Sequence, residues 1–180
     1  MTEDTARYDT RTIVLHWVTA ALILFMWGGA HIIDWFPKGP LRVDARSVHI
    51  VTGVCLLALI MYRAVWRLKG GTRFDDDTTI TTILAKILHY TLYLIIIATL
   101  TLGIFNTWVR GDDLFGFGHI PQFGSYDKAQ RHELANTIVG WHRLGANLIL
   151  ILAAVHALAA IGHFFVLRDK VLQRIFPFLT

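Results

Sequence analysis

Three histidines occur in one apolar stretch, residues 140–163, and each is a candidate for function: His142, His156 and His163. In a helix, His142 and His156 would fall on nearly the same face, about four turns and roughly 21 Å apart. An imidazole inside a bilayer is costly unless it is hydrogen-bonded or bound to a metal. The stretch therefore predicts a membrane helix that offers one ligand to each of two metal centres at different depths.

Four apolar blocks supply the elements that must position these histidines. They cover approximately residues 13–33, 48–68, 80–105 and 138–166, and each has the length of about 20 residues that a spanning helix requires. The chain has 180 residues, of which 54% are hydrophobic and 17% charged. That is less charge than a soluble domain of this size carries, and the length fits one domain. We therefore predict an all-α membrane protein, a single domain over residues 1–180 that folds as a four-transmembrane-helix bundle.

Cysteine and charge exclude two classes of protein. The chain contains a single cysteine, Cys55, so no disulfide can form within it. A four-helix membrane thiol–disulfide enzyme needs cysteine pairs and is excluded. The net charge of +4 raises the alternative of a nucleic-acid partner. However, the basic residues lie between the apolar blocks and form no patch of their own, which indicates membrane topology instead.

Glycine, proline and acidic residues mark the connections between the blocks. The first turn falls at residues 34–40 and the second at residues 70–77. The third connection, residues 106–135, is longer and too irregular to span a membrane. A short interfacial helix is expected within it, over residues 125–136. Its aromatic residues suggest a cap that packs on the end of the bundle: Phe115, Phe117 and Phe123.

The distribution of basic residues favours one orientation. Four spans place both termini on the same side, together with ten basic residues: Arg7, Arg11, Arg63, Arg67, Lys69, Arg73, Lys86, Arg168, Lys170 and Arg174. The opposite side holds seven: Lys38, Arg42, Arg46, Arg110, Lys128, Arg131 and Arg143. By the positive-inside rule, both termini are expected in the cytoplasm. Most tryptophans lie near the block ends, as interfacial anchors do, whereas Trp27 is expected to pack within the bundle.

Depth in the membrane groups four of the histidines into two pairs. Because successive helices alternate in direction, His49 and His142 fall near the outer face, and His16 and His156 fall in the inner half. Each pair joins different helices at similar depth, which is what a six-coordinate haem needs. Two histidine ligands leave no open position for oxygen, so the arrangement suits electron transfer. Nearby glycines could let a flat ring approach, although they also serve helix contacts: Gly53, Gly140 and Gly145.

The residues alone leave the inner ligand opposite His16 open. His163 lies about as shallow as His16, which favours it. His156 is closer to the outer haem. This favours His156 as the ligand, because electron tunnelling weakens steeply with distance. His89 also belongs to the inner half. With Lys86, both His89 and His163 are alternatively candidates for contacts to haem carboxylates or to a quinone carbonyl.

Other polar residues are expected at the surface or the rim. His31 and His119 are expected to be ordinary interfacial residues, and Arg63 and Arg67 are expected to extend their long side chains to the membrane surface. The outer rim is basic and could pair with haem carboxylates, attract an anionic donor or only anchor the interface: Arg42, Arg46, Arg110, Lys128, Arg131 and Arg143.

Short motifs around the histidines resemble those of the prokaryotic cytochrome b561 family. They are L-H-W at 15–17, S-V-H-I-V-T-G at 47–53, and W-H-R-L-G-A-N-L at 141–148 followed by V-H-A at 155–157. The resemblance covers nearly the whole chain and implies a four-helix bundle enclosing two b-type haems. The family's ligand positions fall on His16, His49, His142 and His156, so the resemblance favours His156 over His163.

The resemblance also implies a function in the bacterial inner membrane. Members of the family move electrons between a donor and the quinone pool, and superoxide oxidation at the outer face has been associated with them. We therefore expect transmembrane electron transfer from a periplasmic-side donor, such as superoxide or a protein, to ubiquinone, that is, superoxide:ubiquinone oxidoreductase activity. One alternative is a haem b subunit that passes electrons from a separate dehydrogenase or hydrogenase to quinone, although those related chains are usually longer. Another, from a different class, is a non-haem bundle whose histidines line a proton or metal path.

Overall fold

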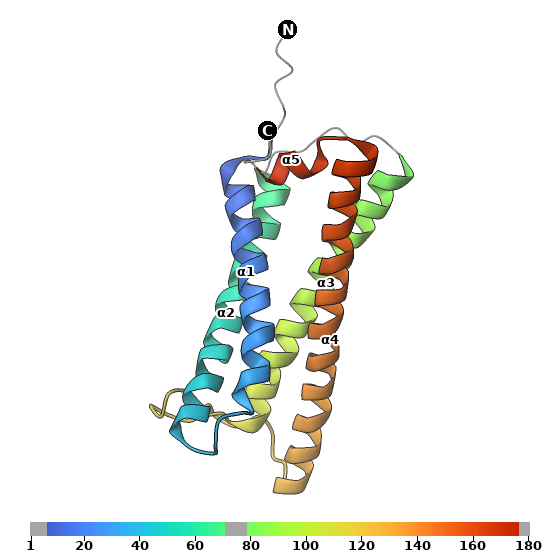
Figure 1. The fold of residues 1–180 in the computed structure, drawn as a ribbon. Coiled ribbons are helices and arrows are strands. Elements are labelled where there is room, and N and C mark those ends of the chain that lie inside the picture. Colours follow the sequence, from blue (N-terminus) through green and yellow to red (C-terminus); the bar gives the residue numbers. More distant parts are fainter. Residues whose placement is uncertain (1–6, 71–78, 177–180) are drawn as a thin grey trace.

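Four long helices dominate the computed structural model, which describes residues 7–70 and 79–176 (Figure 1). They are α1 (Thr10–Ile33), α2 (Pro40–Lys69), α3 (Ile80–Arg110) and α4 (Lys128–Gly162). A single π-helical turn, η1 (His163–Leu167), and a short helix, α5 (Val171–Ile175), follow α4. Each long helix is long and apolar enough to cross a membrane. The all-α class and the four spanning helices are therefore confirmed; of the turn expected at residues 70–77, all but Gly70 lies outside the described residues.

Polar residues at the helix ends explain where the helices begin and stop. The side chain of Asp127 accepts hydrogen bonds from the backbone of Ala129 and Gln130, and Gln130 returns a bond to the Asp127 backbone. This capping box starts α4. The α3 helix ends at Gly111, whose left-handed φ of 65° favours glycine. On α1, the Asp9 carboxylate caps the first turn.

All four long helices extend beyond the apolar blocks that predicted them, α1 by three residues. The α2 helix begins at Pro40 rather than near residue 48, and α3 continues to Arg110 rather than ending near residue 105. The interfacial helix expected at residues 125–136 is not separate, because α4 already begins at Lys128. Hydropathy marks only the lipid-facing part of a helix, whereas caps and hydrogen bonds carry the helix into the polar interface.

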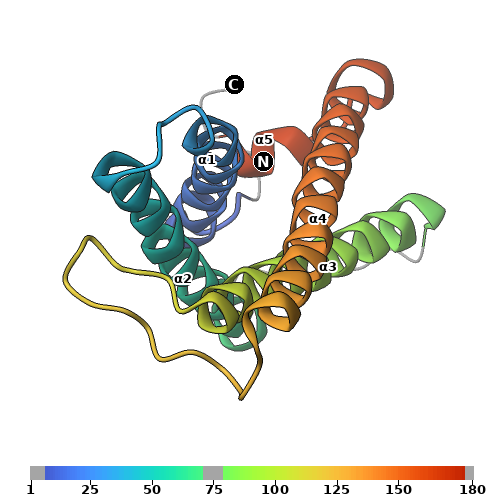
Figure 2. The same cartoon turned by 90° about the horizontal axis from the view of Figure 1, so that it is seen from below.

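The bundle is open along one side. Extensive contacts join α1 with α2, α2 with α3, and α3 with α4 in the described part of the chain. Viewed along the bundle, α1 and α4 face each other across the remaining side (Figure 2). Near one end, α5 closes part of this side, since the Trp17 indole nitrogen donates to the Ile175 carbonyl at 3.1 Å. We call this the terminal end, and the opposite end, with the α1–α2 turn and the α3–α4 connection, the loop end.

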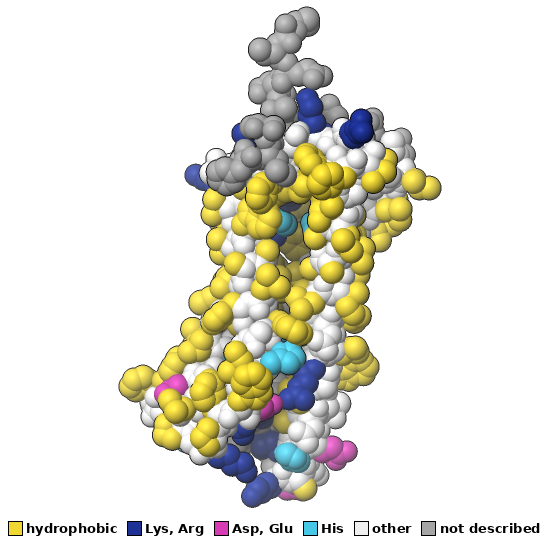
Figure 3. All heavy atoms as spheres, viewed as in Figure 1, with side chains coloured by type: hydrophobic (Ala, Val, Ile, Leu, Met, Phe, Trp, Pro, Cys, Tyr) yellow, Lys and Arg dark blue, Asp and Glu magenta, His cyan; other side chains and the backbone are white. Residues whose placement is uncertain are grey.

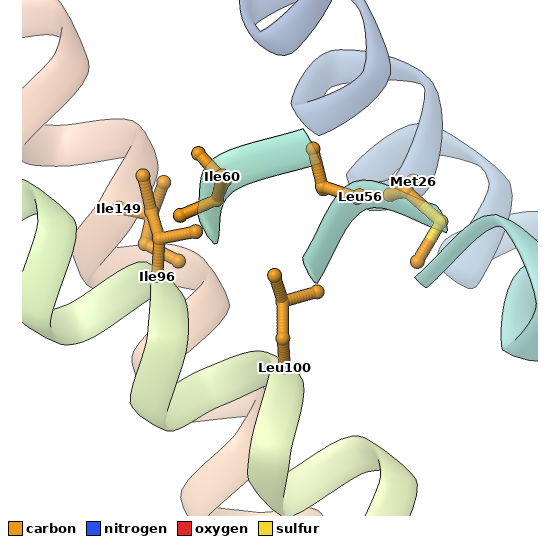
Figure 4. Close-up of a cluster of buried hydrophobic side chains, with 6 residues drawn as sticks. All are labelled: Met26, Leu56, Ile60, Ile96, Leu100 and Ile149. Carbon is orange, nitrogen blue, oxygen red and sulfur yellow. The ribbon is translucent and has the colours of Figure 1, made fainter. Parts of the chain in front are cut away.

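A cluster of buried side chains separates the two ends. It consists of Met26, Leu56, Ile60, Ile96, Leu100 and Ile149. These side chains come from all four long helices and converge between them (Figure 4). Along α4, Ile149 falls midway between His142 and His156. The cluster is therefore an apolar layer with histidines above and below it.

Arg131 and Phe123 help to hold the α3–α4 connection to the bundle, together with Ser47, whose hydroxyl donates to the Asp113 carbonyl and accepts from the Phe115 backbone N–H. The Arg131 guanidinium donates to backbone carbonyls along the connection and at the end of α3: Val109, Phe123, Gly124 and Tyr126. The Phe123 ring packs on Phe105 and Trp108, with ring centres 5.3 and 4.8 Å away. The expected aromatic cap is therefore correct for Phe123 but wrong for Phe117, which is 94% exposed, and the Phe115 side chain is also exposed.

Candidate cofactor sites

At the loop end, His49 on α2 and His142 on α4 face each other. Their ring centres are 6.2 Å apart, and the ring planes make an angle of 73°. Both rings line a cavity of about 310 Å³ that receives side chains from all four long helices. This volume lies in the range of small-molecule and cofactor sites. Its apolar wall includes Met26, Leu56, Ile96, Leu100 and Ile149, which also belong to the buried cluster.

Contacts with α3 fix the orientation of the His142 ring. Its Nδ1 lies 2.8 Å from the backbone carbonyl oxygen of Thr99, which can only accept, so Nδ1–H donates. This leaves Nε2 as the free ring nitrogen, the arrangement in which histidine binds metals. Gly103 lies against the same ring, since a Cβ there would be 2.9 Å from Cε1.

The glycines near the histidines differ from the sequence-based expectation. A Cβ on Gly145 would lie 2.2 Å from Thr99 Oγ1, so this glycine allows α3 and α4 to approach closely. A Cβ on Gly140 would meet nothing, and one on Gly53 would meet only the Met26 side chain. The glycine that borders a histidine ring is Gly103, which sequence reasoning missed because it lies on a helix without a paired histidine.

At the terminal end, His16 on α1 and His156 on α4 form the second pair. Their ring centres are also 6.2 Å apart, with the planes at 59°. His89 on α3 lies close to the same site, with its ring centre 5.1 Å from that of His156 and the planes at 69°. The structure thus brings together the two pairs expected from depth and adds His89 beside the second.

The spacing of both pairs fits an iron between two imidazoles. A metal-bound ring nitrogen lies about 2 Å from the metal and the ring centre about 1 Å further, so two opposed imidazoles have centres about 6 Å apart. The pairs His49–His142 and His16–His156 match this separation. The shorter His89–His156 separation is that of an edge-to-face ring contact. Within residues 7–70 and 79–176, no group of three His, Cys, Asp or Glu residues is placed to hold a bare metal ion.

Arg63 enters the terminal-end site, contrary to the expectation that it extends to the membrane surface. Its Nη2 donates to His16 Nδ1 at 3.0 Å, and its guanidinium lies 5.6 Å from the centre of the Tyr93 ring. Arg67 behaves as expected: it is exposed and lies over the Tyr8 ring. Arg63 and Arg67 are four residues apart on the same helix, but their side chains adopt different rotamers. The Arg63 side chain turns inward because it finds a hydrogen-bond acceptor inside the bundle.

His163 has a different neighbour from the other inner histidines. It begins the π-helical turn after α4, and its Nδ1 contacts the carboxylate of Asp169. Arg168, between them in the chain, adopts a left-handed φ of 55° that brings Asp169 back toward the turn. Asp169 was missed by sequence reasoning, since a carboxylate in the basic tail gave no signal of its own.

The mouth of the loop-end cavity is polar. The Trp27 indole nitrogen donates to Asn147 Oδ1 at 3.0 Å, which bridges α1 and α4 across the open side. His31 also lines the cavity, and its Nδ1 lies 2.8 Å from the Trp27 carbonyl oxygen. The prediction of an ordinary interfacial residue therefore missed its position at the cavity. His119 is a surface residue as expected, with 77% of its side chain exposed. In Figure 3, histidine and basic side chains gather at the loop end, and histidines also lie in a hollow near the terminal end.

Two aspartates pair with part of the basic rim. Asp34 lies 3.6 Å from both Arg42 and Arg143, and it lines the cavity together with Arg143. Asp112 lies 3.3 Å from both Arg46 and Arg110. Each aspartate therefore faces two guanidinium groups.

Comparison with known proteins accounts for this geometry. Residues 7–178 match the family described as prokaryotic cytochrome b561. The chain is 28% identical over 173 residues to a probable superoxide oxidase, CybB, of Yersinia pestis, with 95% of this chain and 96% of that protein covered. It is 26% identical to cytochrome b561 homolog 1 of Escherichia coli, covering 95% and 97%. It is also 28% identical to a cytochrome b562 of Cereibacter sphaeroides, covering 93% of each.

The family match, the four spanning helices and the paired histidines agree with one another. The family implies b-type haem, and the helices place the chain in a lipid bilayer. The molecule is therefore a bacterial multi-pass membrane cytochrome of the b type that takes part in electron transfer. This chain belongs to the prokaryotic cytochrome b561 family.

Proposed function

We propose that this protein transfers electrons across the bacterial inner membrane from a donor at the loop end to ubiquinone. It would hold one b-type haem between His49 and His142 and a second between His16 and His156. The observation that carries the proposal is the pair of equal 6.2 Å ring separations at opposite ends of one bundle. When bound, each haem supplies a one-electron iron couple whose potential the protein tunes.

The chain's own residues bind, orient and shield these groups. The Thr99 carbonyl holds the His142 ring with Nε2 free, and Gly103 leaves space for that ring. The buried cluster around Leu56 and Ile96 keeps water out of the middle of the bundle. Two histidine ligands per iron leave no position for oxygen, which favours electron transfer over oxygen binding.

The loop end suits a small anionic donor. Its rim carries Arg42, Arg46, Arg110 and Arg143 against only Asp34 and Asp112 as ion-pair partners in the described residues. These four guanidinium groups carry more charge than the two carboxylates beside them, and such a local excess raises the concentration of anions nearby. Superoxide is such an anion, and a relative covering almost the whole chain is named a probable superoxide oxidase. Two superoxide ions would give two electrons and release two molecules of dioxygen, and ubiquinone would take these electrons with two protons to form ubiquinol.

The excess of basic residues near the termini supports an orientation with both termini in the cytoplasm and the loop end in the periplasm. In this orientation, the basic rim meets donors from outside the cell. The open side between α1 and α4 faces lipid, where ubiquinone dissolves. Lys86, His89 and His163 are the candidates near the terminal end for a quinone carbonyl.

The proposal is tested by purifying the protein in mild detergent and mixing it anaerobically with superoxide or with ubiquinol as the electron donor. We expect a low-spin b-type spectrum, two haems per chain, and rapid reduction by superoxide followed by reoxidation with ubiquinone. Reduction by ubiquinol but not by superoxide would contradict superoxide as the donor and would show that quinol can supply electrons to the protein. A colourless protein that binds zinc would contradict the proposal and support a transport bundle.

A further inference from the structure

The groups that contact the histidine rings differ in charge between the two pairs. At the loop end, the second nitrogen of His142 meets a carbonyl oxygen, the negative end of a dipole. At the terminal end, the second nitrogen of His16 meets the guanidinium of Arg63, a full positive charge. Groups that contact the second nitrogen of a ligand histidine tune the metal bound at the first. The two sites should therefore differ in their affinity for an electron.

Arg63 is the cation that contacts a paired histidine of the terminal-end site directly, and Arg67, one turn further along α2, also acts on His89. Arg63 is partly buried, and within the described residues no carboxylate lies within ion-pair distance of it. Besides His16, its side chain contacts the Tyr93 ring face, which fixes the guanidinium without cancelling its charge. Arg63 acts electrostatically on three histidines, namely His16, His89 and His156.

Among the residues that the structure describes, the loop-end site has no cation in contact with a paired histidine as Arg63 is with His16. Within the described residues, no arginine donates a hydrogen bond to the ring of His49 or His142, and His142 Nδ1 instead meets the Thr99 carbonyl oxygen. The nearest arginine that lines the cavity, Arg143, is 70% exposed and lies beside Asp34. Water and an opposite charge therefore screen it. Arg63 is partly withdrawn from water, and no carboxylate among the described residues pairs with it.

We propose that Arg63 is the residue that raises the reduction potential at the terminal end above that at the loop end. A nearby positive charge stabilises the form with the extra electron, and the effect is large where water is excluded. One electron moves, and no bond at Arg63 forms or breaks. The resulting difference makes electron movement from the loop end to the terminal end energetically downhill.

The hydrogen bond from Arg63 also predicts a local rearrangement. A guanidinium only donates, so His16 Nδ1 is the acceptor in this contact. A neutral imidazole that binds iron through Nε2 carries its proton on Nδ1, and this proton would then face the guanidinium. Arg63 should therefore transfer its hydrogen bond to another acceptor when haem binds. Its charge stays in the site because the guanidinium lies over the Tyr93 ring.

This inference rests on the proposed haem sites, and redox titration followed by absorption spectroscopy tests it. Single replacements of His16 and His49 by alanine assign each potential to one end. In Arg63→Gln, we expect the reduction potential at the terminal end to fall by about 59 mV. For a one-electron couple, this fall changes the distribution of the electron between the two ends about tenfold. Arg63→Lys, which keeps the charge, should retain most of the difference. Arg67→Gln is the comparison variant: Arg67 is exposed and acts on His89 but not on His16 or His156, so this change should lower the terminal-end potential less than Arg63→Gln does.

The outcomes separate the inference from the proposed function. Two bound haems with an unchanged or higher terminal-end potential in Arg63→Gln would overturn the role of Arg63 and leave the haem sites intact. Loss of the terminal-end haem from Arg63→Gln but not from Arg63→Lys would also overturn it, by showing that the charge serves binding instead. Absence of haem from the unmodified protein would contradict the proposed function itself.

Discussion

The two ends of the bundle hold histidine pairs with the same ring separation but different surroundings. The loop-end pair borders a cavity whose polar mouth opens between α1 and α4. Its His142 is held by a backbone carbonyl and two closely packed helices. The terminal-end pair shares its site with Arg63, Tyr93 and a third histidine, His89. The comparison teaches that the spacing of the two histidines can determine which cofactor is bound. The residues around the rings then determine the reduction potential of that cofactor.

Removing one histidine from either pair should have the largest effect. The changes His142→Ala and His156→Ala are expected to lower the haem content from about two to about one per chain, because each iron loses an axial ligand. Haem-to-protein ratios and the spectrum of the remaining haem measure this. His119→Ala is the control, as this side chain is 77% exposed. Loss of both haems from either variant would show that the two ends are not independent.

Gly103→Ala should affect the loop end alone. The added Cβ would lie 2.9 Å from the His142 ring, so the ring must shift from its hydrogen bond with Thr99. Disturbing such a supporting contact lowers metal affinity about tenfold or more. Haem retention during dialysis against apomyoglobin measures it. Gly28→Ala, where a Cβ meets nothing, is the matched control. An equal loss at the terminal end would contradict the assignment of Gly103 to His142.

Gly145→Ala should lower stability more than it changes either site. A Cβ there would lie 2.2 Å from Thr99 Oγ1, and α3 and α4 must separate or Thr99 must rotate. Overpacking of this kind costs about 1–3 kcal/mol. Thermal unfolding in detergent should show a lower midpoint than that of Gly140→Ala, which places its Cβ in open space. Equal midpoints for the two variants would show that the helices are not in close contact at this point.

The smallest effect is expected from Trp27→Phe. This change removes the hydrogen bond to Asn147 that joins α1 and α4 across the cavity mouth but keeps an aromatic ring. A single such bond contributes about 1 kcal/mol. Unfolding of the variant should begin at a slightly lower temperature, and Asn147→Leu should show no further loss when combined with it. Additive losses would mean that the two side chains act separately.

The chain of amino acids determined the number of spans and the grouping of histidines by depth. Both follow from hydropathy and from the alternating direction of successive helices, which depend on local composition and on bilayer thickness. For that reason the sequence predicted that His49 pairs with His142 and His16 with His156. The structure places the ring centres of each pair 6.2 Å apart. Haem ligation by these residues stays a prediction for the experiments above.

Tertiary packing decided which side chains surround each pair. Periodicity alone could not show that Arg63 turns inward, that Thr99 offers its carbonyl to His142, or that Gly103 lies against that ring. These features depend on the rotation of each helix about its axis and on contacts between residues distant in sequence. The sequence therefore determined where the histidines lie along the membrane normal, whereas the helix packing decided the electrostatic environment of each ring.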